Sequence, residues 1–156
     1  MLHASDQAAG LRRLFRRTPS AVVALFASGR APRTLALQTL VALTEGARRV
    51  VVLDEHAPDD GSLLSAFGFP EGVDLLGALQ GQHDVTENMR EVADGLWVVP
   101  AAATVHAVSL LDDAHHARLE AGITELQRRA DLLAIHAVGD ARRLTPFARA
   151  AGRRLL

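Results

Sequence analysis

The sequence contains no lysine and no cysteine, and aromatic residues make up only 4% of it. The absence of cysteine excludes disulfide bonds and thiolate metal sites. The absence of lysine means that all 17 basic residues are arginines. Because aromatic residues are scarce, we expect leucine, valine and alanine to fill the core.

Long apolar runs and targeting segments are also missing. A transmembrane helix needs about 18 consecutive apolar residues, and no stretch of this chain approaches that length. No apolar segment of signal-peptide length stands ahead of a cleavage site near the first residue. We therefore expect a cytoplasmic protein.

What the sequence does contain fits one domain with a sizeable core, since 49% of its 156 residues are hydrophobic. The formal net charge is −1, so the overall charge favours no nucleic-acid partner. Many arginines stand in pairs, and both ends of the chain are basic. These pairs are Arg12–Arg13, Arg16–Arg17, Arg48–Arg49, Arg128–Arg129, Arg142–Arg143 and Arg153–Arg154. They are interpreted either as solvated helix faces or as purposeful basic ends.

Apolar runs and helical patterns alternate along the chain. Continuous apolar runs, typical of strands buried on both faces, cover residues 21–27, 50–53, 96–99 and 132–137. Helical patterns cover residues 34–45, 63–67, 75–79 and 115–129. This alternation predicts a three-layer α/β fold, in which a parallel sheet of about four strands carries helices on both faces.

Two more helices are expected outside that alternation. Residues 5–17 form a short helix ahead of the sheet, and Thr18-Pro19-Ser20 ends it. Residues 144–155 show a basic amphipathic pattern that fits either a helix docked on the sheet or a weak contact with an anionic membrane. We divide the chain into an N-terminal helix and linker over 1–20 and an α/β domain over 21–156.

The loop after the first strand is the place where a parallel sheet binds phosphates. It reads Ser28-Gly29-Arg30-Ala31-Pro32-Arg33-Thr34, with one glycine, no lysine, and a proline that removes one N–H donor. Arg33 can still contact an anion at the start of the following helix. The loop is interpreted either as an ordinary connection or as a residual nucleotide site that includes Gly29, Arg30, Arg33, Thr34 and Asp54.

The order of these segments resembles the MinD/ParA family of P-loop ATPases. The resemblance rests on the segments ALFASGRAPRTLALQTLVAL, RRVVVLDEHAPDDGSLLSAFG, DGLWVVPAA and ADLLAIHAVGD. It implies a degenerate P-loop fold in which Asp54 matches the strand-two aspartate of the family. His56 replaces the second aspartate of that loop, and His136 stands where the Walker-B acid is expected.

A second resemblance lies at Asp6-Gln7-Ala8-Ala9-Gly10-Leu11-Arg12. It is similar to the DQAxxLR motif of the flagellar MinD-like regulators FlhG, YlxH and FleN. In that family the motif docks on FlhF, an SRP-type GTPase, and stimulates GTP hydrolysis. The resemblance implies that Gln7 points to the active site of the partner, where a glutamine can orient the attacking water. Asp6 would then cap the helix, Ala8 and Leu11 would pack on the partner, and Arg12 would make a polar contact.

The resemblance therefore implies a non-enzymatic regulator of flagellar number, with an FlhF-like GTPase as partner. Flagellar C-ring components and anionic membrane are further partners that it suggests, with a location at the inner membrane or the cell pole. No cofactor is expected, although residual ATP binding is retained as an alternative. A weak ATPase that uses Arg30 or Arg33 in place of lysine, and a scaffold for another partner, are the competing hypotheses.

The seven histidines do not predict a metal site, because none of them forms an H-x-x-x-H pair. His136 is the one histidine expected on a buried strand. A buried imidazole needs a hydrogen-bond partner, so we expect His136 to have one.

Overall fold

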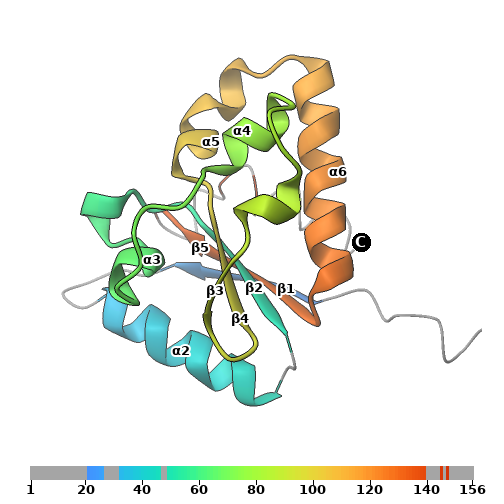
Figure 1. Ribbon diagram of the computed structural model, residues 1–156. Helices are drawn as coiled ribbons and strands as arrows, with labels where there is room; N and C mark the ends of the chain where they lie inside the picture. The colour runs from blue at the N-terminus through green and yellow to red at the C-terminus, as the bar shows by residue number, and fades with distance from the viewer. Residues whose placement is uncertain (1–20, 27–31, 47–48, 140–144, 146, 148–156) are drawn as a thin grey trace, which may run out of the picture.

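A computed structural model of the chain describes residues 21–26, 32–46, 49–139, 145 and 147. The predicted helix over 5–17, the loop residues 27–31 and most of the predicted helix over 144–155 lie outside these residues. The predicted three-layer α/β fold is confirmed (Figure 1).

The centre of the molecule is a five-stranded sheet with the order β1-β5-β2-β4-β3. Its strands are β1 (Ala21–Phe26), β2 (Val50–Asp54), β3 (Arg90–Ala93), β4 (Leu96–Pro100) and β5 (Leu132–Ala137). Four of them are parallel and match the four predicted strands, while β3 pairs with β4 in the antiparallel direction. The strands β2 and β5 lie at the middle, and every residue in both is buried, as their continuous apolar sequences predict.

The strand β3 was not expected from the sequence. It has only four residues, two of them charged, so it shows no apolar run. The turn Asp94-Gly95 joins it to β4, and Gly95 takes a φ of 71°. An Asp-Gly pair between two short strands is a hairpin signal, and this was the clue available in the sequence.

Helices cover both faces of the sheet (Figure 1). One face carries α2 (Pro32–Gly46) and α3 (Leu63–Ala66), whose buried leucines pack with Val50 and Val52 of β2. The other face carries α4 (Leu75–Leu79), α5 (Ala102–Ala107) and α6 (Asp113–Arg129), which pack with Val51 and Leu53. The side chains of β2 thus alternate between two apolar clusters, as the pleat of a strand requires.

Short 3-10 turns complete the connections, at η1 (Pro58–Asp60), η2 (Val85–Asn88) and η3 (Val108–Leu110). The helix α6 begins two residues before its predicted start, because the Asp112 carboxylate caps it by accepting the His115 N–H at 2.8 Å. The helix α2 extends the predicted helical pattern over 34–45 by two residues at its start and by Gly46 at its end.

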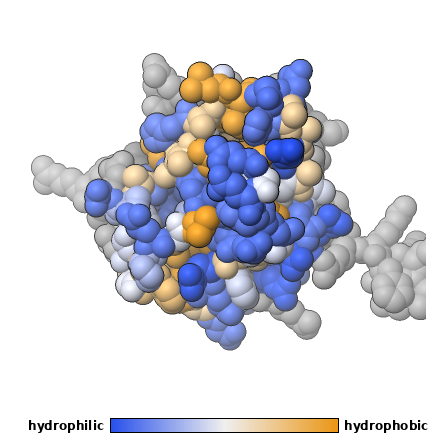
Figure 2. Space-filling view, turned by 45° about the horizontal axis from the view of Figure 1, so that its top comes forward, coloured by the Kyte–Doolittle hydropathy of each residue, from blue (hydrophilic) through white to orange (hydrophobic). Residues whose placement is uncertain are grey.

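Three observations bear on the membrane contact considered from the sequence. No helix in the described ranges is long and apolar enough to cross a membrane. Most of the face seen in Figure 2 is hydrophilic, and its apolar side chains occur in small groups. Phe147, which belongs to the predicted amphipathic segment, is fully buried in the cluster on the α6 face of the sheet. This side chain therefore contributes to the core and is not available to a membrane.

Candidate functional site

The candidate site lies where β2 and β5 end, at the carboxyl edge of the parallel strands. Asp54 is the last residue of β2 and is the register partner of His136 on β5. The His136 Nδ1 atom lies 2.9 Å from Oδ1 of Asp54, and both side chains are 2% exposed. Since an ionised carboxylate can only accept, Nδ1 donates to Asp54. His136 therefore has a hydrogen-bond partner, as predicted, and this partner is Asp54.

Both oxygens of Asp54 are engaged. Oδ2 accepts the Leu63 N–H at 2.6 Å, at the first residue of α3, and Oδ1 also accepts the His56 N–H at 3.3 Å. Asp54 therefore holds the loop after β2 and the start of α3 in place. A carboxylate oxygen can accept two hydrogen bonds; these bonds use both positions of Oδ1 and one of the two positions of Oδ2.

His56 lies against His136, with ring centroids 4.1 Å apart and an interplanar angle of 26°. The MinD/ParA resemblance places acids at the positions of these two histidines. The two replacements are in direct contact, so imidazoles occupy the space where that family would have carboxylates. The pair could not be foreseen, because it depends on how β2 and β5 align across the sheet.

Glu55 is a third buried polar residue at this edge, and sequence analysis did not single it out. Its side chain is 1% exposed, and Oε2 accepts the Val138 N–H at 3.0 Å just after β5 ends. Burial is the main cause that raises the pKa of this carboxyl, while hydrogen bonds from Thr145 and Val138 and the nearby His136 oppose the rise. Glu55 thus ties the end of β2 to the chain that follows β5. A charged residue directly after a buried strand was the signal available.

Asp74 was also missed, and it joins two helices above the sheet. Its carboxylate caps α4 through the Leu76 N–H and accepts from the Ala103 N–H and from the N–H and hydroxyl of Thr104, at 2.6–3.1 Å. The buried Asn88 donates to the carbonyl oxygens of Val73 and Asp74. These bonds fix the segment after β4 beside the start of α4.

Two of the remaining predicted site residues, Arg33 and Thr34, lie in the described part of the chain. Thr34 lies in the first turn of α2 with its side chain exposed, and Arg33 precedes it in that helix, with its side chain outside the description. Gly29 and Arg30 lie outside the described residues. The proposed partner-binding residues Asp6, Gln7, Ala8, Leu11 and Arg12 do as well.

The side chains at this edge of the sheet decide whether Mg²⁺ would find suitable ligands there. Mg²⁺ prefers oxygen ligands, usually carboxylates together with phosphates. Here β5 presents an imidazole, and both Asp54 oxygens already accept hydrogen bonds. Among the described residues, no three His, Asp or Glu side chains are grouped as a metal site. At the β5 position where the resemblance implies an acid, the described side chain is thus an imidazole, which is not a ligand that Mg²⁺ prefers.

No protein-family model matches the sequence, and no curated protein matches it at a significant level. Solved structures do match its fold. Cobyrinic acid a,c-diamide synthase from Mycobacterium smegmatis, with bound ADP and magnesium, has a TM-score of 0.58 and 24% identity over 76% of this chain and 51% of its own. McdA from Cyanothece, a variant in complex with ATP, has a TM-score of 0.59 and 19% identity over 85% of this chain and 52% of its own.

The cell division ATPase MinD from Pyrococcus furiosus has a TM-score of 0.55 and 20% identity over 85% of this chain and 54% of its own. The chain spans about half the length of these three proteins. At such identities the likeness concerns the fold, and it agrees with the order of segments in the sequence. The chain therefore has the fold of the MinD/ParA-type P-loop ATPases.

Proposed function

We propose that the chain is a non-enzymatic regulator of flagellar biosynthesis or number, in which a MinD/ParA-type body carries a helix that stimulates an SRP-type GTPase of the FlhF kind. The observation that supports a non-enzymatic α/β body is the buried hydrogen bond between Asp54 and His136. The sequence Asp6–Arg12 supports the stimulation of a GTPase through its resemblance to the DQAxxLR motif.

The Asp54–His136 pair argues against ATP hydrolysis by this body. Enzymes that transfer phosphoryl groups rely on positioning and on cations that neutralise the phosphates, usually a lysine and a Mg²⁺ held by an acid. The chain has no lysine. The acid on β2, Asp54, is hydrogen-bonded to the imidazole of His136. His136 itself stands on β5 at the position where the resemblance implies a second acid. The same residues stabilise the fold, since they join two central strands.

The N-terminal motif supplies the activity in this proposal. Gln7 would enter the active site of the partner and orient the attacking water, while Arg12 would contact polar groups beside it. Ala8 and Leu11 lie three residues apart and would anchor one face of the helix in a groove. The α/β body would then act as a carrier that positions this helix.

The proposal is tested by the GTP hydrolysis rate of an FlhF-type GTPase, measured alone and with the chain added. We expect the chain to accelerate hydrolysis and the Gln7→Ala variant to lose that acceleration. Arg13→Ala is the matched control, because it changes a neighbouring residue outside the motif and should keep the acceleration. If both variants accelerate hydrolysis equally, the motif does not carry the activity.

A further inference from the structure

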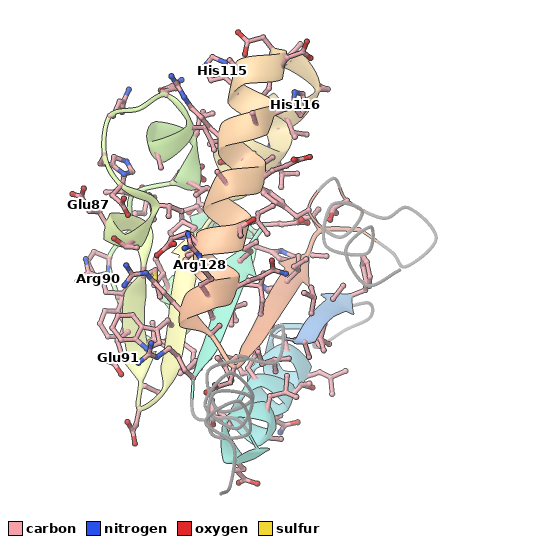
Figure 3. The ribbon with its side chains drawn as sticks, turned by 90° about the vertical axis from the view of Figure 1, so that its right-hand side faces the viewer. Glu87, Arg90, Glu91, His115, His116 and Arg128 are labelled. Atoms are coloured by element: carbon pink, nitrogen blue, oxygen red, sulfur yellow. The ribbon has the colours of Figure 1, made fainter. Side chains whose placement is uncertain are left out.

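Two buried polar atoms near η2 have no hydrogen-bond partner among the residues that the structure describes. They are Oδ1 of Asn88, a residue that is only 3% exposed, and Nε2 of His83. Asn88 ends η2, and His83 stands just before the residue that caps it. Figure 3 shows α4 and η2 side by side next to α6, with Glu87 labelled on η2. Since nearly all buried polar groups in folded proteins are hydrogen-bonded, each of these two atoms requires an explanation.

The orientation of the Asn88 amide is fixed by its nitrogen. Nδ2 donates to the carbonyl oxygen of Val73 at 2.7 Å and to that of Asp74 at 3.0 Å. If the amide were turned over, Oδ1 would face these two oxygens, and neither of them can donate a hydrogen. Oδ1 is therefore the end of the amide without a partner, and it can only accept a hydrogen bond.

The backbone at Asp84 fixes the tautomer of His83. Nδ1 of His83 lies 3.2 Å from the carbonyl oxygen of Asp84, and because this oxygen can only accept, Nδ1 carries the hydrogen. The same oxygen accepts the Glu87 N–H at 3.0 Å, inside the capping box of η2, so its position is well defined. When Nδ1 of a neutral imidazole carries the hydrogen, Nε2 has a lone pair. The second buried atom is thus an acceptor as well.

Both acceptors belong to side chains that contact the first turn of α4. Nε2 of His83 lies 2.5 Å from the place that a Cβ on Gly77 would occupy, so the ring packs directly on this residue. The Asp74 carbonyl oxygen that accepts from Asn88 Nδ2 also accepts the Gly77 N–H, at 3.2 Å. Two acceptors cannot bond to each other. A ligand that satisfies both must bring two hydrogens.

We propose that one buried water molecule donates one hydrogen bond to Nε2 of His83 and one to Oδ1 of Asn88. Buried waters typically make about three hydrogen bonds, to polar groups that the protein itself leaves unpaired. A hard cation would fit this pair poorly, because such cations prefer oxygen ligands and one member is an imidazole nitrogen. The water fastens η2 and the residue before its cap to α4. It also accounts for a glycine inside α4, since a side chain at Gly77 would displace the His83 ring.

A crystal structure of the full chain that resolves ordered water tests the proposal. We expect one water about 2.7–3.2 Å from both acceptor atoms. His83→Phe keeps a ring against Gly77 and removes the acceptor nitrogen, so this variant should lose the water. His106→Phe, at an exposed position of α5, is the matched control and should keep it. A water on only one of the two atoms, no water, or a bridging water that survives His83→Phe would overturn the proposal.

Nuclear magnetic resonance tests the same site in solution, on the unmodified chain. The ring nitrogen shifts of His83 should report a hydrogen on Nδ1 and a hydrogen-bonded lone pair on Nε2, whereas free neutral histidine prefers the opposite tautomer. The side-chain amide protons of Asn88 should show a nuclear Overhauser effect to a long-lived water. This effect should vanish in His83→Phe and persist in His106→Phe, with circular dichroism showing that each variant keeps the fold. A hydrogen on Nε2, or no water contact at Asn88, would contradict the proposal.

Discussion

Nδ1 of His136 lies 2.9 Å from Oδ1 of Asp54. This hydrogen bond joins β5 to β2, and the two residues are 82 positions apart in the sequence. Both side chains are almost completely buried. An acid and an imidazole are thus hydrogen-bonded to each other at the carboxyl edge of the parallel strands.

Replacing His136 should destabilise the protein. His136→Ala leaves a buried carboxylate with one bond fewer and removes the ring that stacks on His56, so we expect a loss of about 2–3 kcal/mol in the free energy of unfolding. Urea denaturation measures it. His116→Ala, at an exposed position of α6, serves as control and should change stability by less than about 0.5 kcal/mol. Equal effects of the two variants would show that the buried pair is not stabilising.

The Glu55 carboxyl should make stability depend on pH. Burial raises its pKa in the folded state above the ordinary value of 4.5, so the folded protein binds more protons than the unfolded chain above that pH. Stability should therefore fall as pH rises from 4.5 through the folded-state pKa. Glu55→Gln keeps an acceptor for the Val138 N–H and removes the charge, so it should flatten this part of the curve. Urea denaturation at a series of pH values measures the effect.

The exposed Glu91 provides the comparison for Glu55. Glu91→Gln changes the same functional group on the β3 edge and should leave the pH dependence as it is in the unmodified chain. A curve that Glu55→Gln leaves unchanged would show that another group causes the fall in stability.

Two helical glycines should respond to alanine in opposite directions. At Gly122 in α6 an added Cβ would lie 3.5 Å from Val85 Cγ2, an ordinary contact, so Gly122→Ala should stabilise the protein by about 0.5–1 kcal/mol. At Gly77 in α4 the Cβ would lie 2.5 Å from Nε2 of the His83 side chain. Gly77→Ala should therefore destabilise by about 1–2 kcal/mol, and adding His83→Ala should remove most of that loss. Thermal denaturation of the four proteins gives the comparison.

ATP binding separates the proposed regulator from a weak ATPase. Titration calorimetry with ATP and Mg²⁺ should show no saturable binding in the micromolar range, because the described edge presents an imidazole where the metal would need a carboxylate. The Arg33→Ala variant, which removes the charge of Arg33, tests the alternative of a weak ATPase that uses this arginine in place of lysine. Saturable binding that this variant abolishes would support arginine in place of lysine at the loop.

The sequence predicted the strands β2 and β5 well because each is a continuous apolar run at the middle of a parallel sheet. It placed Asp54 at the carboxyl edge for the same reason. It did not predict the Asp54–His136 bond or the stacking of His56, since β5 lies between β1 and β2, and that order depends on pairing between distant segments. The charged strand β3 and the buried Glu55 were missed because their residue types are those of exposed positions.

In the proposed function, the chain stimulates a GTPase without using ATP itself. The most direct test measures GTP hydrolysis by an FlhF-type protein with this chain added, in the presence and in the absence of ATP. We expect the same acceleration in both conditions. Acceleration that requires ATP, or no acceleration in either condition, would contradict it.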